Sequence, residues 1–202
     1  ITVSASLKDA DKNAVSGLRL NAEVVTVPNA TLSGSWTDNK DGTYSATYTA
    51  TKAGSALKAS LKLADWAKAS ESAAYSIGAG KAAQANSTLT TDKAAYTAGD
   101  SITVSASLKD ADKNAVSGLK LNAEVVTVPN ALQGSVWKDN GDGTYVATYT
   151  ATKAGSALKA TLKLADWAKA SESAAYSIGA GKAVQANSTL TTDKAAYTAG
   201  DS

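Results

Sequence analysis

Apolar and polar residues alternate through much of this chain. From Ser101 to Asp110 every second residue is apolar, and polar side chains stand between them. The alternation resumes after the turn-forming run Asp139–Gly143, continues to Thr150, and returns over residues 158–164. A period of two places alternate side chains on opposite faces of a strand, and sheets with one wet face pair their strands antiparallel. The pattern therefore predicts an all-β chain of antiparallel strands.

Alternation also predicts a strand from Leu119 to Val125, and a last strand is expected from Ala174 to Ile178. A first strand is expected near Ser87–Thr91, and its sequence returns near Ser188. Residues 164–170 come nearest to a helical pattern and predict at most a short turn. About seven strands separated by turn residues are typical of a sandwich of two sheets.

A repeat of 101 residues organises the chain. The segment that starts at Ile1 starts again at Ile102, and 2 × 101 accounts for all 202 residues. About 11 of the 101 positions differ, and most of them lie between Thr31 and Lys40. One unit of about 100 residues has the size of a single Ig-like sandwich. The sequence thus predicts tandem Ig-like antiparallel β-sandwiches with about seven strands in each repeat.

Runs of Ile-Gly-Ala-Gly at 77–80 and 178–181 mark the expected joints between sandwiches. We therefore expect a sandwich lacking its first strand in 1–80, a complete sandwich in 81–181, and the first strand of a following repeat in 182–202. Because an unpaired strand edge invites association, we expect a neighbouring chain, head to tail, or a continuation of the array to supply the missing strand.

Composition removes several classes of function. The formal net charge is +2, with both signs interspersed, so no basic run indicates a nucleic-acid partner. No stretch approaches the ~20 apolar residues of a membrane span, so we expect no membrane insertion by this segment. The chain has no Cys and no His, which removes Cys/His zinc sites, Ser-His-Asp triads and thiol nucleophiles. We expect no enzyme, and therefore no catalytic, cofactor-binding or metal residues.

Asp9, Asp11 and Asn13 have the spacing of a calcium-binding loop, and the motif returns 101 residues later. Such a loop also needs Gly at its sixth position and an acidic residue at its twelfth, which here are Ala14 and Leu20. We therefore favour an ordinary turn, in which Asp and Asn bond nearby backbone amides, over a calcium site.

Asp38 and Asp41, with their counterparts Asp139 and Asp142, are paired carboxylates of the kind that a glycosidase requires. Each pair lies within one tight turn, whereas catalytic carboxylates face each other across a cleft. The spacing therefore favours turn formation.

The tryptophans and lysines offer candidate binding surfaces. Trp66 and Trp167 could stack on a sugar or mark a contact patch, but we favour rings that fold over the end of their own sandwich. Trp36 and Trp137 fall in the variable stretch and are expected on a strand at the sheet edge. A solvated polar face is favoured over an anion site for Lys58, Lys62, Lys159 and Lys163.

Three runs carry a resemblance to a known family: SITVSASLKDADKNAVSGLKL, DNGDGTYVATYTATKAG and ALKATLKL. They resemble the group 1 bacterial Ig-like domains of the intimin and invasin adhesins, the inverse autotransporters. The chain departs from the family pattern at Ala115 and Ala14, where Pro is usual, and in its lack of Phe. The resemblance implies a bacterial cell-surface adhesin, anchored in the outer membrane, whose Ig-like rod carries a binding tip. Anchor and tip would lie in regions outside this chain.

Two functions remain open. The first is a non-enzymatic spacer that extends the tip from the outer membrane, since near-identical neighbours suit a function that depends on copy number. The alternative is a repeat that itself binds a host glycan or protein, or self-associates in a biofilm, with the variable stretch Thr31–Lys40 as the place for specificity. The expected partners are neighbouring repeats of the same protein.

Overall fold

The protein is described as a computed structural model that covers residues 1–200. Strands and loops make up these residues, apart from two short 3-10 turns, η1 (Gln84–Asn86) and η2 (Gln185–Asn187). The predicted all-β class is confirmed. Neither turn is long or apolar enough to cross a membrane, and the described residues hold no other helix. The chain forms two compact units. One consists of residues 1–88, 106–120 and 139–145, and the other of residues 89–105, 121–138 and 146–200.

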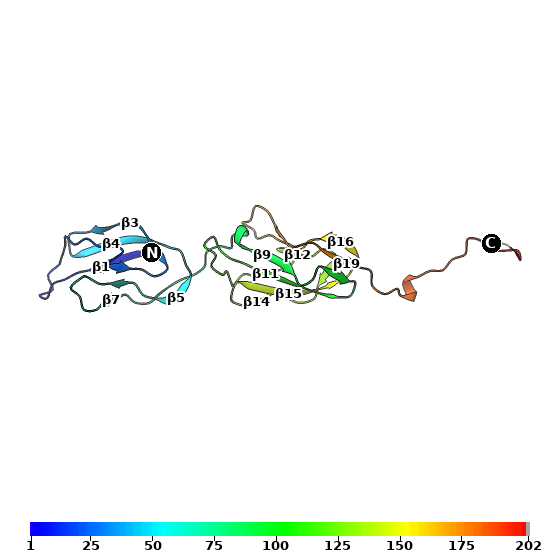
Figure 1. The fold of residues 1–202 in the computed structure, drawn as a ribbon, viewed down its shortest axis with the longest axis horizontal. Helices are drawn as coiled ribbons and strands as arrows, with labels where there is room; N and C mark the ends of the chain where they lie inside the picture. Colours follow the sequence, from blue (N-terminus) through cyan, green and yellow to red (C-terminus); the bar gives the residue numbers. More distant parts are fainter. Residues whose placement is uncertain (201–202) are drawn as a thin grey trace. The chain divides into compact units, whose positions relative to one another are not determined.

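Residues 1–80 are called the first repeat and residues 81–181 the second repeat. The first repeat contains eight strands, which form three small sheets (Figure 1). The sheet orders are β1-β4-β3, β2-β6-β7 and β5-β8, all with antiparallel pairs. The strands are β1 (Thr2–Ser6), β2 (Val25–Thr26), β3 (Ala30–Asp38), β4 (Thr43–Ala50), β5 (Gly54–Leu57), β6 (Ser60–Leu61), β7 (Ser70–Glu71) and β8 (Tyr75–Ile77).

The core of the first repeat follows the predicted alternation along β4. Tyr44, Ala46 and Tyr48 are buried on one face of this strand, and Val25 on β2 and Ala59 beside β6 close the same cluster. Burying such side chains contributes roughly 25 cal/mol per Å² of apolar surface. With no Phe or Met in the sequence, tyrosine supplies the largest fully buried side chains, which include Tyr44.

The second repeat has two strands that the first repeat lacks, one beside β11 and one beside β19. Its sheets have the orders β13-β15-β11-β9, with β14 also on β15, then β12-β17-β18, and β10-β19-β16. The strands are β9 (Thr88–Thr91), β10 (Ala95–Thr97), β11 (Ser101–Ser107), β12 (Val126–Thr127), β13 (Ala131–Gln133), β14 (Lys138–Asp139), β15 (Thr144–Ala151), β16 (Gly155–Leu158), β17 (Thr161–Leu162), β18 (Ser171–Glu172) and β19 (Tyr176–Gly179).

The turn before β15 requires a glycine at position 143. Gly143 has φ 81°, a conformation that side chains with a Cβ rarely adopt. A Cβ at Gly143 would lie 2.8 Å from the Leu108 carbonyl oxygen and 2.9 Å from the Ala115 Cβ. The predicted turn therefore also packs against the end of β11.

The strand predicted from Leu119 to Val125 is wrong. The side chain of Asn122 accepts a hydrogen bond from the Glu124 amide at 3.0 Å, and the Asn122 carbonyl accepts those of Val125 at 3.1 Å and Val126 at 2.9 Å. These bonds curl the chain into a turn, and only β12 follows it. The side-chain amide of Asn competes with strand pairing in this way.

Two further details differ from the alternation pattern. The single strand expected over 158–164 is divided between β16, which pairs with β19, and β17, which pairs with β12 and β18. The pattern also missed β10, which pairs with β19 in parallel. A parallel pair therefore joins an early strand of the repeat to its last one, whereas the pairs β12–β17, β13–β15, β16–β19 and β17–β18 are antiparallel.

Candidate functional site

The turn from Asp110 to Asn114 holds the segment that leads into the second repeat, residues 80–87, here called the lead-in segment. Oδ2 of Asp110 accepts the Gly80 amide at 2.7 Å and Nδ2 of Asn114 at 3.0 Å. Oδ1 accepts the Asp112 amide at 3.0 Å and the Asn114 amide at 2.8 Å. One carboxylate thus closes its own turn and binds a backbone amide 30 residues earlier.

The hydrogen bonds to Asp110 also lower the pKa of its carboxyl group. Asp110 is only 4% exposed, and its burial raises the pKa of the carboxyl. The hydrogen bonds from Asn114, Gly80 and Asp112 outweigh burial, so the pKa of Asp110 lies below its ordinary value. The carboxylate therefore stays ionised and keeps all four acceptor contacts at neutral pH.

Two further hydrogen bonds attach the lead-in segment to the loop that follows β11. The Ala83 amide donates to the Lys109 carbonyl at 2.7 Å, and Nδ2 of Asn86 donates to the Asp110 carbonyl at 2.8 Å. Beyond this segment, β9 buries Leu89 to 3% exposure. The lead-in segment and β9 are therefore part of the packed structure of the second repeat.

The first repeat has the same turn, at residues 9–13. Oδ1 of Asp9 accepts the Asp11 and Asn13 amides at 3.0 and 2.8 Å, and Oδ2 accepts Nδ2 of Asn13 at 3.0 Å. These are the bonds of the ordinary turn favoured from the sequence. No group of three or more His, Cys, Asp or Glu residues that could hold a metal ion occurs within residues 1–200.

A groove lies beside β1 in the first repeat. It has a volume of about 200 Å³ and lies between β1 on one side and β6 and β7 on the other. Its apolar lining includes Val3, Ala5, Leu7, Ala59, Leu61 and Trp66. The groove is therefore lined by apolar side chains of the first repeat's core.

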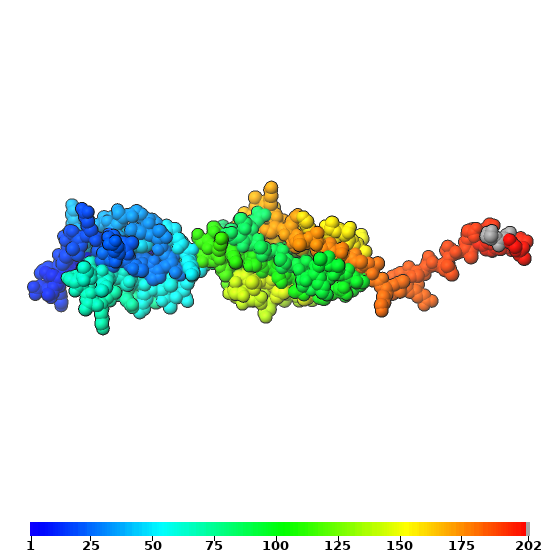
Figure 2. Space-filling view, in the orientation of Figure 1, coloured from blue at the N-terminus to red at the C-terminus, as the bar shows by residue number. Residues whose placement is uncertain are grey.

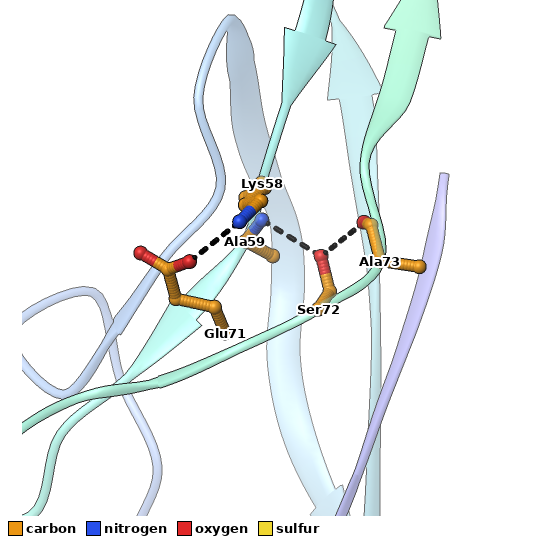
Figure 3. A network of polar contacts seen from close by, with 5 residues as sticks. All are labelled: Lys58, Ala59, Glu71, Ser72 and Ala73. Carbon is orange, nitrogen blue, oxygen red and sulfur yellow. Dashed lines mark hydrogen bonds and ion pairs between the residues drawn. The ribbon is translucent and has the colours of Figure 1, made fainter.

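A polar network stands along one wall of this groove (Figure 3). The hydroxyl of Ser72 accepts the Ala59 amide at 3.0 Å and donates to the Ala73 carbonyl at 2.7 Å. Beside it, Nζ of Lys58 lies 2.9 Å from Oε2 of Glu71. The second repeat has the same arrangement, with 2.7 Å between Lys159 and Glu172, so the groove wall is the same in both repeats.

The paired carboxylates close turns, as their spacing indicated. Oδ2 of Asp38 accepts the Gly17 amide at 2.6 Å, and Oδ1 of Asp41 accepts the Thr43 amide at 2.9 Å. Hydrogen bonds from Thr43 lower the pKa of Asp41. Asp139 and Asp142 repeat these contacts with Gly118 and Thr144, so in both repeats the carboxylates are engaged with the backbone.

The tryptophans pack against their own repeats. Trp167 is buried, and its counterpart Trp66 packs half-buried against the core of the first repeat. Trp36 lies on the edge strand β3, where its Nε1 donates to the Tyr48 hydroxyl at 3.2 Å, and the two rings meet edge to face. Trp137 makes the matching bond to Tyr149 at 3.3 Å from a loop, because the variable stretch interrupts the strand there.

The lysines lie at the surface. Lys62 and Lys163 are exposed, and Lys58 and Lys159 pair with glutamates while remaining about half exposed, at 51% and 49%. This arrangement agrees with the solvated polar face. Sequence reasoning missed the role of Asp110 in binding Gly80, because a contact across 30 residues leaves no local pattern.

Comparison with known proteins finds similarity to bacterial adhesins. The family model for domain 3 of invasin matches residues 1–75. The inverse autotransporter adhesin YeeJ of Escherichia coli K12 is 31% identical over 182 residues, which are 89% of this chain and 8% of YeeJ.

Two solved structures have related folds. The Escherichia coli adhesin FdeC matches with a TM-score of 0.58 and 31% identity, over 90% of this chain and 59% of that one. InvD of Yersinia pseudotuberculosis matches with the same TM-score of 0.58 and 24% identity, over 94% of this chain and 55% of that one, and supports the fold alone. The chain thus spans a small part of the curated relative and less than two thirds of both structures. With its sandwich strands and repeat motifs, the chain belongs to the Ig-like repeats of the intimin and invasin adhesin family.

Proposed function

We propose that this chain is a non-enzymatic stalk segment of a bacterial cell-surface adhesin. The observation that carries the proposal is that the two repeats duplicate their structural contacts. The Tyr44 hydroxyl donates to the Val15 carbonyl at 3.0 Å, and Tyr145 donates to Val116 at 2.9 Å. The candidate polar residues close turns or pair at the surface, so the duplicated feature is the sandwich itself. YeeJ and FdeC are named as adhesins, which supports a place at the cell surface.

The proposed division into domains follows from the pairing of β9. Residues 81–181 form one complete sandwich, 1–80 form a sandwich without its first strand, and 182–202 begin the next. Residues 201 and 202 of this last segment lie outside the described residues. Neighbouring repeats are therefore the first partners of this chain. Regions outside it would supply the outer-membrane anchor and the binding tip.

Changing the number of repeats tests the stalk function. A strand of nine residues spans roughly 30 Å, so each added sandwich should add a constant increment of length. We expect the maximum dimension from small-angle X-ray scattering to rise linearly across arrays of two, four and eight repeats. In the full adhesin, deleting repeats should weaken adhesion to cells, and an unrelated sandwich array of equal length should restore it. Adhesion that only these repeats restore would contradict a spacer.

A binding function is the second candidate, and the variable stretch favours it. Leu132 and Val136 in this stretch are 67% and 84% exposed, which is unusual for large apolar residues so close to each other. Binding of the 202-residue chain to glycan arrays or host cells should then be saturable. Leu132→Asp with Val136→Asp should abolish it, while Leu190→Asp, also at an exposed site, should leave it intact. Absence of saturable binding would remove this candidate.

A further inference from the structure

We propose that Asn140 is a site of spontaneous deamidation, a covalent modification that the second repeat undergoes and the first does not. The reacting groups are the side-chain amide of Asn140 and the backbone nitrogen of Gly141, in the turn between β14 and β15. The products are aspartate and isoaspartate at position 140. Since the reaction consumes only water, it is independent of whether the chain acts as a spacer or as a binding repeat.

The sequence singles out this asparagine. The 202 residues include ten asparagines, and Asn140 alone is followed by glycine. Deamidation begins when the backbone nitrogen of the next residue attacks the side-chain carbonyl carbon of asparagine. A side chain on that next residue hinders the approach, whereas glycine has none and adopts more conformations. The equivalent pair in the first repeat is Asn39-Lys40, so one position of the variable stretch distinguishes the two turns.

The turn exposes the reacting pair and leaves it room to move. Residues 139–142 are exposed, and the yellow-green part of the chain around them lies at the surface in Figure 2. A Cβ built on Gly141 would meet nothing within 4 Å. Gly143 is buried, and a Cβ there would lie 2.8 Å from the Leu108 carbonyl oxygen. The backbone can therefore rearrange at Gly141, while packing holds it at Gly143, which makes Asn140 rather than Asp142 the reactive residue.

Two hydrogen bonds position the reacting groups. The Gly141 amide donates to Oδ1 of Asp139 at 2.8 Å, so the proton that the nitrogen must lose already points at a carboxylate. Nδ2 of Asn140, the leaving group, donates to Oγ1 of Thr144 at 3.0 Å. Both bonds lie at exposed positions, where water can replace them at a small net cost.

The reaction balances without any further reactant. The Gly141 nitrogen forms a bond to Cγ of Asn140, and the bond from Cγ to Nδ2 breaks. The proton of the Gly141 amide passes to the Asp139 carboxylate and then through water to Nδ2, which leaves as ammonia. Water opens the resulting five-membered imide at either carbonyl. Opening at one carbonyl gives aspartate with the original backbone, and opening at the other gives isoaspartate.

Conversion removes contacts that close the turn. Oγ1 of Thr144 gives its own proton to Oδ1 of Asp142 at 2.5 Å, so it can only accept from residue 140. An ionised carboxylate at position 140 has no proton to donate, and it adds a third negative charge beside Asp139 and Asp142. Isoaspartate also lengthens the backbone, which disturbs the 3.0 Å bond from the Asn140 amide to the Thr144 carbonyl. The modified turn is therefore looser than the original one.

Peptide mapping of the aged protein tests the proposal. The folded 202-residue chain is incubated at neutral and at mildly alkaline pH, then digested in acid and analysed by mass spectrometry. We expect conversion at Asn140 to accelerate with pH and to be at least about tenfold faster than at Asn39, because glycine does not hinder ring closure. Gly141→Lys should abolish it, and Lys40→Gly should install it at Asn39. Lysine fits this position, since Lys40 has φ 63° in the equivalent turn. Equal rates at the two asparagines, or no effect of Gly141→Lys, would overturn the proposal.

The same chain unfolded in urea provides the reference for the effect of the fold. Conversion at Asn140 in urea but none in the folded chain would show that the turn protects this residue, and would also overturn the proposal. The effect on the turn is measured separately, by hydrogen exchange of Asn140→Asp followed by NMR. We expect faster exchange at the Thr144 amide and unchanged exchange at the equivalent Thr43 amide of the first repeat. Unchanged exchange at both amides would refute the loosening of the turn.

Discussion

The two repeats have almost the same sequence but bury their side chains differently. Tyr75 is half-buried in the first repeat, while its counterpart Tyr176 is 2% exposed and meets Tyr96 edge to face at 5.9 Å. Leu61 is half-buried, and Leu162 is fully buried. The cause is the presence of β9 and β10 in the second repeat. Burial in this fold thus depends on whether these two strands pack against the rest of the sandwich, and the local sequence alone does not determine it.

The largest effect is expected at the leucine of β9. Leu89→Ala should lower the free energy of unfolding of the second repeat by about 3 kcal/mol, since it leaves a cavity in a packed site. Leu190→Ala, at the equivalent position, should change stability by less than about 0.5 kcal/mol while the chain is monomeric. Urea denaturation with hydrogen exchange and mass spectrometry can assign each change to a repeat. Equal losses from both variants would contradict the comparison.

A smaller effect is expected at the two equivalent turns. Asp110→Ala removes the acceptor of four hydrogen bonds at a buried site and should cost about 2 kcal/mol. Asp9→Ala changes an exposed turn and should have a clearly smaller effect. Hydrogen exchange at Gly80 should accelerate in Asp110→Ala only. Unchanged exchange at Gly80 would show that this carboxylate does not hold the lead-in segment.

Acid pH should destabilise the second repeat more than the first. Burial raises the pKa of Asp92, but hydrogen bonds from Tyr96 and Thr103 and the charge of Lys93 outweigh it, so this pKa is lowered. The other lowered carboxyl pKa values are matched between the repeats, Asp9 with Asp110 and Asp41 with Asp142, so Asp92 makes the difference. A lowered pKa stabilises the folded state above the unfolded value of 3.8, and this stability is lost as pH falls through the folded pKa. Thermal unfolding monitored from neutral pH to below 3.8 should show the second repeat losing more stability than the first. Asp92→Asn should reduce the difference, and parallel losses in both repeats would contradict it.

The smallest effect is expected at the surface ion pairs, which do not differ between the repeats. Glu71→Gln and Glu172→Gln should each change the free energy of unfolding by less than about 0.5 kcal/mol, because both pairs are about half exposed. Urea denaturation should show similar values for the two. A large loss of stability from only one of these variants would contradict the expectation that the two ion pairs contribute equally.

Much of the fold could be predicted from the sequence because its signals are local. Alternation identified β11 and β15, and the Asp-Asn-Gly-Asp-Gly run identified the turn between Lys138 and Thr144. Strand β10 escaped prediction because three residues between turns show no alternation, and its parallel partner lies about 80 residues away. Asn122 escaped because its backbone-binding side chain occupies a polar position in an otherwise regular pattern. The hold of Asp110 on Gly80 likewise depends on the folded chain.

The parallel pair of β10 and β19 determines how the second repeat responds to tension. Ala95–Thr97 lies near the start of this repeat and Tyr176–Gly179 at its end, and the two strands point in the same direction. Pulling on the two ends of the repeat therefore drags these strands past each other along their lengths. All hydrogen bonds of the pair are loaded together in shear, whereas peeling would break them one at a time. Forced unfolding is governed by the unfolding rate, so we expect this pairing to raise the force at which the second repeat unfolds.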